Sequence, residues 1–482
     1  MRVVILGAGV SGHTAALLLR RKLPASHEVV VVSPNRLWNW IPSNIWVGVG
    51  AMRPEQVTFE LKPVYDRMRI RFLQAKGTEI HPEGDAESGP FVLVESTAEG
   101  NAGQTERLTY DYLINATGPR LDFGATPGLG PENNSLSVCS YQHAAATSRQ
   151  LDAAIERLKR GERQTLLVGM GHGTCTCQGA AFEYLFNLDF ALRRQGVRHL
   201  ARLVFLTNEA GLGDFGVGGM FLKAGGYVIP SQTFAESLFE ERGIEWITGA
   251  HVHRVDPGRV EYETLDGNRD ELAFDFAMLL PPFKGVLLKA FSHDGSDLTG
   301  ELFAPSGFMK VDADYTAKNF DEWEASDWPE TYQTRYPNIF AIGIAFAPPH
   351  AISRPRKTPN GTPVAPAPPR TGMPSAIMGR TVAQSIADMI LRGAERPTHG
   401  ASMAKLGAAC VASTGMSPIN GTAASLTMFP IVPDHRTYPE TGRSLIYTTG
   451  ELGLAGHWIK HLLHVAFLYK AKALPFWWMI PE

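Results

Sequence analysis

The sequence predicts an α/β fold, and three observations lead to that prediction. A short apolar segment at residues 2–6 leads into a glycine-rich turn and then into a helix rich in Leu and Ala. The same order of strand, turn and helix returns at residues 164–194. Two more apolar segments, 110–119 and 336–343, end in small residues. Strands that alternate with helices in this way favour a parallel sheet with helices packed on both faces.

The size and charge of the chain are those of a globular protein with two or three domains. It has 482 residues and a formal net charge of -3. Proteins that bind nucleic acid carry basic patches, so this near-neutral balance gives no reason to expect nucleic acid as a partner. The 4 cysteines are too few for a disulfide scaffold, and their spacing matches no zinc pattern. We therefore predict no metal site and a redox use for the cysteines.

The first glycine turn has the pattern of a dinucleotide-binding site. Gly7 allows a tight turn, Gly9 lets the backbone approach a pyrophosphate, and Gly12 permits close packing of the following helix. The next strand ends in Ser33-Pro34-Asn35, without the acidic residue that usually binds a ribose hydroxyl. Ser33 is then the residue expected to hydrogen-bond the ribose. The whole unit predicts a Rossmann-like domain at the N-terminus.

Two later strand ends resemble the cofactor-contacting segments of flavoproteins that have two dinucleotide-binding domains. These strand ends carry Thr117-Gly118 and Gly343. In such flavoproteins FAD is held by distant parts of one chain. The resemblance therefore favours FAD over NAD at the N-terminal turn.

The second glycine turn lies where reductases of that superfamily bind NAD(P)H, but its residues are wrong for this ligand. The run Val168-Gly-Met-Gly-His-Gly-Thr-Cys-Thr-Cys177 places extra, bulkier residues where a dinucleotide would approach the backbone. Cys177 falls near the N-terminus of the following helix, where the macrodipole lowers the pKa of a thiol. We expect either a nucleophilic thiolate at this position or an inert Cys that acts as a small hydrophobic residue.

Several further motifs stand beside the first turn: Val138-Cys-Ser-Tyr-Gln-His143, Cys177-Gln-Gly-Ala-Ala-Phe-Glu183, Gly213-Asp-Phe-Gly-Val-Gly-Gly219, Pro282-Phe-Lys-Gly285 and Arg370-Thr-Gly-Met373. Together these motifs resemble the family of sulfide:quinone oxidoreductases and flavocytochrome c sulfide dehydrogenases. The resemblance extends over most of the chain. It implies two Rossmann-like domains, sulfide bound as a persulfide on Cys177, FAD as the electron relay and a membrane quinone as the acceptor.

The resemblance also implies how the chain divides into domains. Residues 1–125 and 301–392 would form the FAD-binding domain in two parts. Residues 126–300 would form a second Rossmann-like domain that carries the Cys site, and residues 393–482 a C-terminal region.

Roles for single residues follow from the same resemblance. Cys139 matches a position that in some members is bonded to the flavin or lies over its ring, and an unmodified Cys is the alternative. His143 and Glu183 match positions near the sulfide site, so either one is expected to take the proton of hydrosulfide. Arg370 stands where the family usually has Lys, and its charge would stabilise the anionic reduced flavin. The expected cofactor-binding residues are Gly7, Gly9, Gly12, Ser33, Asn35, Pro42, Thr117, Gly118, Cys139, Gly343, Arg370 and Gly372.

The chain departs from the family pattern in its cysteines. The family normally has a second redox Cys in the region that here reads Lys310-Val-Asp-Ala-Asp-Tyr-Thr316. Cys175 is the nearest replacement in sequence, although a disulfide between Cys175 and Cys177 would close a short, strained ring. Otherwise an external thiol, sulfite or a second sulfide takes the sulfur from Cys177. We interpret Cys410 as structural.

Two long loops are expected near the site. Residues 317–335 are acidic and aromatic and are interpreted as an insertion, by default a solvated loop, otherwise a lid or a subunit contact. Residues 348–369, the Pro-rich loop, resemble an expanded form of the loop that covers the family's sulfide site. Its cations Arg354, Arg356 and Lys357 would attract hydrosulfide, or would simply lie in solvent.

The C-terminal region is predicted to contain an amphipathic basic helix. One arc of this helix carries His457, Lys460, His461 and His464, and another carries Trp458, Leu462, Val465 and Tyr469. Aromatic residues follow at 474–480, a composition that favours attachment to the lipid bilayer surface, with an oligomer interface as the alternative. The first strand begins at residue 2 and no apolar run reaches ~18 residues, so neither a signal peptide nor a spanning helix is expected. We predict a monotopic homo-oligomer on the prokaryotic cell membrane, with the membrane face undetermined.

Sulfide:quinone oxidoreductase chemistry is the function that these residues favour. One alternative is the flavin subunit of a cytochrome-linked sulfide dehydrogenase, which needs a haem partner. Another is an NADH:quinone reductase, which needs a competent second nucleotide turn. A flavin-bearing sulfur-binding protein without turnover is the alternative of a different class.

Overall fold

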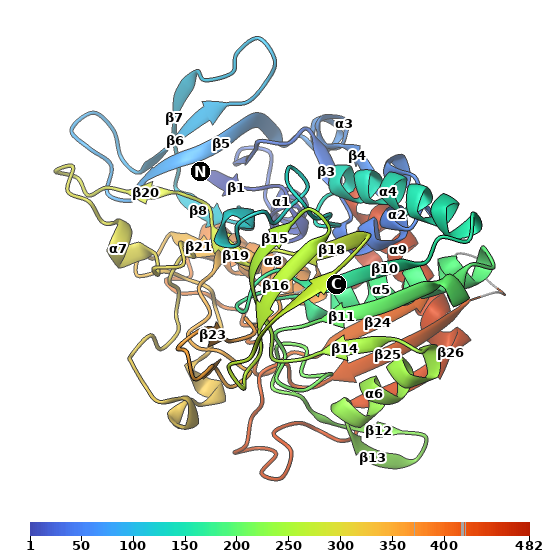
Figure 1. Cartoon of the computed structure of the whole chain (residues 1–482). Helices are drawn as coiled ribbons and strands as arrows, with labels where there is room; N and C mark the ends of the chain where they lie inside the picture. Colours follow the sequence, from blue (N-terminus) through green and yellow to red (C-terminus); the bar gives the residue numbers. More distant parts are fainter. Residues whose placement is uncertain (371, 416–418, 420) are drawn as a thin grey trace.

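The protein, described by a computed structural model for residues 1–370, 372–415, 419 and 421–482, has the predicted α/β fold (Figure 1). Its first sheet has the strand order β21-β8-β1-β2-β5-β6-β7 and is parallel from β21 to β5. The strands are β1 (Arg2–Leu6), β2 (Glu28–Ser33), β5 (Arg71–His81), β6 (Phe91–Ser96), β7 (Thr105–Thr109), β8 (Tyr112–Asn115) and β21 (Ile339–Ala341), with β20 (Lys289–Ala290) paired to β5. Helix α1 (Val10–Lys22) packs against β1 and β2 and against α8 (Gly372–Arg392).

The central strands of this sheet are buried on both faces because their sequences are continuous apolar runs. Val3, Val4 and Ile5 in β1 are fully buried. Parallel strands that are covered by helices on both sides typically have such runs in place of an apolar and polar alternation. The predicted strand and helix are both confirmed, and the helix begins at Val10, earlier than the Leu- and Ala-rich run alone indicates.

Parallel pairing brings three distant turns to one edge of the sheet. Asn115 at the end of β8 lies in register with Leu6 at the end of β1 and with Ala341 at the end of β21. The turns that begin at Gly7, Thr117 and Gly343 therefore start side by side. Ligands of open α/β sheets bind at this carboxyl edge of the strands.

The second sheet is also parallel and has the strand order β14-β11-β10-β18. Its strands are β10 (Gln164–Met170), β11 (Ala201–Leu206), β14 (Glu245–Ile247) and β18 (Phe276–Leu280). Helices α4 (Tyr141–Lys159), α5 (Gln178–Arg194) and α6 (Ser231–Arg242) belong to this part of the chain, next to the antiparallel strands β15 (His251–Asp256), β16 (Arg259–Glu263) and β17 (Arg269–Ala273). The strand and helix predicted on either side of Cys177 are confirmed as β10 and α5.

A third sheet joins the C-terminal region to the middle of the chain. Its order is β13-β12-β26-β25-β24, and its strands are β12 (Phe221–Ala224), β13 (Tyr227–Pro230), β24 (Ala408–Thr414), β25 (Thr422–Met428) and β26 (Thr449–Gly453). Helix α9 (Leu454–Ala471) packs on β24, β25 and β26, and β24 packs against α5. In Figure 1 the orange-red C-terminal strands accordingly lie beside the green elements of the second domain.

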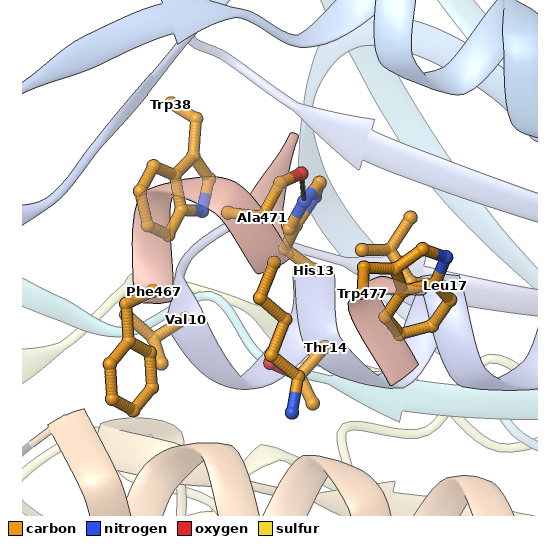
Figure 2. Close-up of a pocket in the computed structure, with 9 residues that line it drawn as sticks. Val10, His13, Thr14, Leu17, Trp38, Phe467, Ala471 and Trp477 are labelled. Atoms are coloured by element: carbon orange, nitrogen blue, oxygen red, sulfur yellow. Dashed lines mark hydrogen bonds between the residues drawn. The ribbon is translucent and has the colours of Figure 1, made fainter. Parts of the chain in front are cut away.

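The end of the chain docks on the first domain. His13 of α1 donates from Nε2 to the carbonyl oxygen of Ala471 at 2.7 Å and accepts from the Tyr65 hydroxyl at 2.8 Å, because burial lowers the pKa of this His to about 4 and keeps it neutral. Figure 2 shows His13 packed among aromatic side chains that include Phe467 and Trp477. The cavity left between them is about 10 Å³, enough for about one water molecule. No helix in the described part of the chain has both the length and the apolar character to cross a membrane.

Shorter elements complete the fold. They are α2 (Asn44–Gly48), α3 (Leu61–Met68), α7 (Thr299–Leu302), and the strand pairs β3 (Leu37–Asn39) with β4 (Thr58–Glu60), β9 (Pro119–Leu121) with β19 (Phe283–Gly285), and β22 (Arg356–Lys357) with β23 (Pro363–Val364).

Residues 317–335 differ from the solvated loop that was the default expectation. Trp328 is buried and donates from Nε1 to His350 Nε2 at 2.8 Å, and Asp321 pairs with Arg354, so this segment packs on the Pro-rich loop.

Candidate active site

The first glycine turn leaves open space at the position where a pyrophosphate would approach. Gly7 has φ +104°, and a Cβ there would lie 2.1 Å from the Ala116 carbonyl oxygen. A Cβ at Gly12 would lie 2.1 Å from the Gly7 carbonyl oxygen, so Gly12 does allow close packing. At Gly9, which precedes the first residue of α1, a Cβ would meet nothing within 4 Å. Free amides at a helix N-terminus and open space beside them fit the diphosphate of FAD.

Several of the other expected cofactor residues lie beside this turn or contact one another. Gly343 has φ +65°, and a Cβ there would lie 2.5 Å from Ser11 Oγ. The end of β21 therefore packs closely against α1. The Thr117 hydroxyl donates to Asn115 Oδ1 at 2.8 Å, and Gly118 follows it with φ +70°. A Cβ at Gly372 would lie 3.9 Å from Pro42 Cγ. Ser33 ends β2, and its hydroxyl faces the turn backbone at Asn35.

Cys177 occupies a strained position at the start of α5. It is the residue that precedes the first helical turn and has φ +69° and ψ +38°, a left-handed conformation that non-glycine residues rarely adopt. Such strain is concentrated at functional sites, where the surrounding structure holds it. Cys177 is half-buried, and its thiol is free.

The pKa of the Cys177 thiol is raised, in contrast to the expectation from the helix macrodipole. Burial is the largest cause, and the Thr176 hydroxyl and the Arg370 charge act in the opposite direction. Burial therefore disfavours the thiolate by more than Thr176 and Arg370 favour it. A thiolate at this site therefore depends on nearby cations.

Arg370 supplies a buried cation in range of Cys177. It is 5% exposed, and its Nη1 donates to the carbonyl oxygens of Ile344 at 2.9 Å and Phe346 at 2.5 Å. The guanidinium lies over the ring of Phe308 at 4.5 Å. Burial lowers the pKa of Arg370 to about 10, so the group stays charged at neutral pH. Its Nε has no partner among the described residues, which leaves a donor for an anionic ligand.

Cys175 and Cys139 are in different environments although both are near Cys177. Cys175 is fully buried and its thiol donates to the Leu280 carbonyl oxygen at 3.1 Å. Burial raises its pKa, which disfavours the role of redox partner that the sequence offered for it. Cys139 is half-buried, just before α4, and burial raises its pKa to about 12, with the charge of Cys177 adding to the effect.

Glu183 and His143 were both expected near the sulfide site, and the structure gives them separate surroundings. Glu183 is on α5, is 5% exposed, and accepts from Lys460 Nζ of α9 at 3.0 Å. Burial raises the pKa of Glu183, and Lys460 partly opposes this. His143 is in the first turn of α4, packs edge-on to Phe123, and has an Nδ1 without a partner in the described chain. The sequence gave no signal for the pairing with Lys460, which comes from a helix far along the chain.

The second glycine turn is filled by the protein itself. A Cβ at Gly171 would lie 2.4 Å from Leu129 Cδ1, and one at Gly173 would lie 2.3 Å from the Pro363 carbonyl oxygen. The Pro-rich loop runs along this turn, because Ala365 N donates to the Gly173 carbonyl oxygen at 2.8 Å. Space that a nicotinamide dinucleotide would need is taken by this loop.

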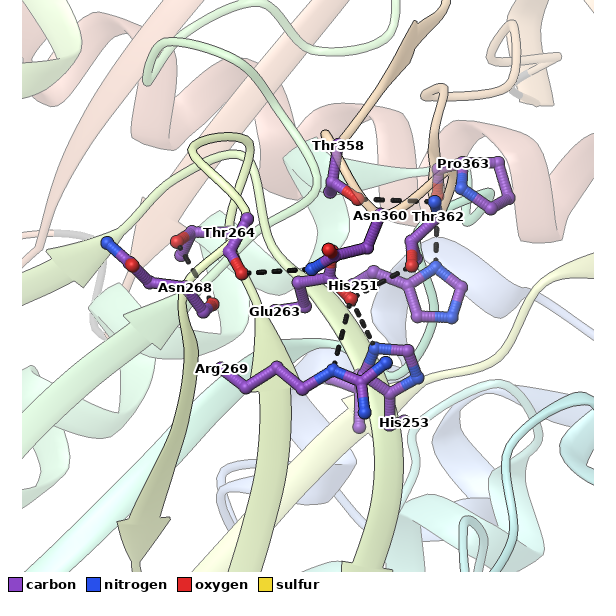
Figure 3. A network of polar contacts seen from close by, with 12 residues as sticks. His251, His253, Glu263, Thr264, Asn268, Arg269, Thr358, Asn360, Thr362 and Pro363 are labelled. Atoms are coloured by element: carbon purple, nitrogen blue, oxygen red, sulfur yellow. Dashed lines mark hydrogen bonds and ion pairs between the residues drawn. The ribbon is translucent and has the colours of Figure 1, made fainter.

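A buried carboxylate holds the Pro-rich loop in place (Figure 3). Glu263 of β16 accepts from Thr362 Oγ1 at 2.9 Å, from Asn360 Nδ2 at 3.2 Å and from His253 Nε2 at 2.9 Å. Burial raises the pKa of Glu263, but these hydrogen bonds outweigh burial and lower it to about 2. Of the three loop cations expected to attract hydrosulfide, Arg354 is paired with Asp321, and the other two lie exposed on β22.

Helix α9 is amphipathic as predicted, but its polar arc faces the protein interior. His457 and His464 are buried, and Lys460 pairs with Glu183. Leu462 is 67% exposed and Val465 is 61% exposed. Water-soluble helices have the opposite arrangement, so the outward face of α9 is an apolar surface.

Comparisons with known proteins agree with this architecture. The model of the pyridine nucleotide-disulphide oxidoreductase family matches residues 1–182, which include the first turn and Cys177. A sulfide-quinone reductase of Aquifex aeolicus is 28% identical over 470 residues, covering 98% of this chain and 91% of that protein. The crystal structure of the sulfide:quinone oxidoreductase of the same bacterium superposes with a TM-score of 0.75 at 26% identity, over 98% of this chain and 91% of that one. The chain is thus similar over nearly its whole length to a sulfide-quinone reductase.

More distant relatives are consistent with that kinship. The mitochondrial sulfide:quinone oxidoreductase of Mus musculus is 23% identical and covers 71% of this chain and 64% of its own length. The NDH2 structure from Plasmodium falciparum, solved with NADH, has a TM-score of 0.61 at 13% identity and shares the fold alone. The resemblance read from the sequence is thus confirmed, as is the flavoprotein fold, and the protein is an FAD-dependent oxidoreductase.

Proposed function

We propose that the protein is a sulfide:quinone oxidoreductase that binds sulfide sulfur on Cys177. One observation carries the proposal: a strained thiol beside the buried Arg370 cation, in a turn whose nucleotide space is filled by the chain. The full-length kinship with sulfide:quinone oxidoreductases supports the same reaction. An NADH:quinone reductase would need the space that the Pro-rich loop occupies.

The protein's own residues would carry the sulfur and proton steps. Cys177 Sγ forms a bond to the sulfur of hydrosulfide, and one proton and one electron pair leave the sulfur atoms as the persulfide forms. The Arg370 charge favours the thiolate that makes this bond. Glu183 or His143 accepts the proton; burial raises the pKa of the Glu183 carboxyl and lowers the pKa of the His143 imidazole. FAD, which the turn around Gly7, Gly9 and Gly12 would hold, would supply the acceptor for this electron pair and the route to the quinone.

An anaerobic titration of the flavin absorbance tests this function. Sulfide should bleach the flavin of the purified holoenzyme, a quinone analogue should restore it, and NADH should leave it unchanged. Cys177→Ser should bind FAD normally and lose bleaching by sulfide. Bleaching by NADH would contradict the proposal, and no bleaching by either reductant would favour a sulfur-binding protein without turnover. Reoxidation by cytochrome c but not by quinone would favour a cytochrome-linked dehydrogenase.

Attachment of FAD through Cys139 is a finer proposal. The half-buried thiol lies just before α4 and in electrostatic range of Cys177, as a residue at the flavin edge would. After denaturation in acid, flavin should stay with the wild-type chain and be released from Cys139→Ser. Complete release from the wild type would contradict a covalent bond.

We also propose that the exposed face of α9 binds the surface of a lipid bilayer. Apolar side chains on this face, together with the exposed Phe476 and Met479, are suited to the headgroup layer. Truncation after Gly456 would also remove the ion pair between Lys460 and Glu183, so Leu462→Glu with Val465→Glu is the cleaner variant. It should lose association with vesicles, whereas Leu287→Glu, at an even more exposed Leu elsewhere, should keep it. Unchanged vesicle binding together with a smaller oligomer would favour a homo-oligomer interface instead.

A further inference from the structure

Two buried amide side chains lie against the turn that ends in Cys177. Gln178 is the first residue of α5, Asn208 follows β11, and both are fully buried. Gln178 Nε2 donates to Asn208 Oδ1 at 2.9 Å. The last residue of β11 lies in register with Gly169 of β10, so the second sheet brings Asn208 next to the turn that follows β10. We call Gln178 and Asn208 the amide pair.

The amide pair holds two backbone carbonyl groups of this turn. Asn208 Nδ2 donates to the carbonyl oxygens of Gly173 and Cys175, each at 3.1 Å. Gln178 Nε2 donates to the Cys175 carbonyl oxygen, also at 3.1 Å. A buried carbonyl group without a hydrogen bond is unfavourable, so these bonds favour the one turn conformation in which they form. The bond from Gln178 to Cys175 also spans Cys177, because it joins the residue after Cys177 to a residue before it.

Two other segments close the same turn. The backbone N–H groups of Ala365 and Ala367 in the Pro-rich loop donate to the same two carbonyl oxygens, at 2.8 Å and 3.0 Å. A Cβ at Gly216 would lie 3.1 Å from Gln178 Oε1 and 2.9 Å from the Ala367 carbonyl oxygen. The motif of residues 213–219 therefore packs on the amide pair. The turn is held between the Pro-rich loop and the amide pair, and the amide pair is the side-chain part of this clamp.

We infer that the amide pair positions Cys177 Sγ for bond formation with sulfide, an inference that rests on the proposed sulfide oxidation. Cys177 has φ +69°, and a residue other than glycine keeps such a conformation only where its surroundings enforce it. The hydrogen bonds of the amide pair act on both sides of this strained residue. Without them Cys177 relaxes to an ordinary conformation, and its Sγ moves away from the Arg370 charge. The amides act through the backbone, so Gln178 and Asn208 are positioning residues.

Alkylation of Cys177 as a function of pH tests the positioning without turnover. The holoenzyme, free of sulfide, is treated with iodoacetamide, and the peptide that carries Cys177 is followed by mass spectrometry. Arg370 lowers the pKa of Cys177. A thiol that has moved away from this cation should ionise at a pH about one unit higher in Asn208→Leu and in Gln178→Met. Both replacements are uncharged and close to the original side chain in size, so the main change is the loss of the hydrogen bonds.

A buried Asn elsewhere in α5 provides the matched control. Asn187 Nδ2 donates to the carbonyl oxygens of Glu183 at 2.9 Å and Ser413 at 2.7 Å, and the residue is 2% exposed. Asn187→Leu should lose about as much stability to chemical denaturation as Asn208→Leu, and it should keep the alkylation profile of Cys177. If the amide pair served stability alone, the two Leu variants would be alike in both measurements, and that result would overturn the inference.

The kinetics of flavin reduction measure the catalytic effect. A displacement of Sγ by about 1 Å should slow the first reduction of flavin by sulfide about a hundredfold in each variant, with flavin content unchanged. The effects should not add in the double variant, because Gln178 and Asn208 act as one hydrogen-bonded unit. A wild-type alkylation profile and a wild-type rate in both single variants would overturn the inference. Failure of both to fold, when Asn187→Leu folds, would assign the amide pair to stability and would also overturn it.

The two measurements separate this inference from the proposed function. If sulfide does not reduce the flavin of the wild type, sulfide oxidation fails, and the alkylation profiles still decide whether the amide pair positions the thiol. If sulfide reduces the wild type and both variants equally well, with one alkylation profile for all three, only the positioning fails.

Discussion

The two glycine turns of this protein have the same local pattern of strand, turn and helix, but the first has open space beside it and the second does not. Around Gly9 a Cβ would meet nothing within 4 Å, whereas at Gly171 it would lie 2.4 Å from Leu129. The first turn keeps its helix N-terminus accessible to a ligand. The second is filled from outside by Leu129 and the Pro-rich loop, and it holds a strained Cys in place of a nucleotide. A glycine pattern therefore predicts the turn, and remote segments decide what the turn does.

The largest expected effect is at the open turn. Gly9→Leu should lower FAD affinity at least about a hundredfold, because its side chain enters the space that the pyrophosphate needs. The apoprotein should unfold at the same temperature as the wild type, since no protein atom lies within 4 Å of the new Cβ. Flavin content and thermal unfolding measure the two effects. Gly300→Leu, at another glycine with open surroundings, should keep its FAD. Normal FAD binding by Gly9→Leu would show that the open turn is not the cofactor site.

A smaller effect is expected from the cation beside the thiol. Arg370 lowers the pKa of Cys177, so Arg370→Gln should raise it. In a plot of the rate of flavin reduction by sulfide against pH, the acidic limb should move to higher pH by about one unit. The reaction should then be about tenfold slower at neutral pH. Arg370→Lys keeps the charge and should keep the limb near its original position. An unmoved limb in Arg370→Gln would show that the cation does not act on Cys177.

At the filled turn, a substitution should affect stability and leave FAD in place. Gly171→Ala should destabilise the protein by about 1–3 kcal/mol, because its Cβ overlaps Leu129. Chemical denaturation measures this difference, and flavin content should be unchanged. In a Leu129→Ala background, which lacks the overlapping side chain, Gly171→Ala should cost less stability than it does in the wild type. Wild-type stability in Gly171→Ala would mean that the second turn has room for a ligand after all.

The smallest effect concerns the anchor of the Pro-rich loop. Glu263→Gln should destabilise the protein by about 1–2 kcal/mol at neutral pH, since it weakens hydrogen bonds to a charged group. The pKa of Glu263 is depressed in the folded protein, from 4.5 to about 2, so its contribution is present above pH 4.5 and is lost as the pH falls towards 2. Wild type and variant should therefore converge in stability over that interval. A constant difference down to pH 2 would assign the effect to packing.

Much of the fold could be predicted because its signals are local. The apolar runs of β1 and β10, and the helices after each turn, follow from hydrophobic patterns within about twenty residues. The pairing of β12 with β26 could not be predicted, because it joins Lys223 to Thr449 and neither strand indicates its partner. The orientation of α9 could not be predicted either. Its periodicity separates a polar arc from an apolar arc, but it does not show which arc faces the protein.

The candidate site also has features that could be predicted from the sequence and features that could not. The sequence by itself determined the residue types and their local positions: an open glycine turn at Gly9, a thiol at the start of α5 and a cation at Arg370. Tertiary structure alone decided which of them act together, because it placed the Pro-rich loop in the second turn, Lys460 on Glu183 and Asn208 beside Gln178. The reason is physical: turn and helix geometry depend on a few neighbouring residues, whereas burial, pKa and hydrogen bonds between side chains depend on contacts between segments far apart in the chain.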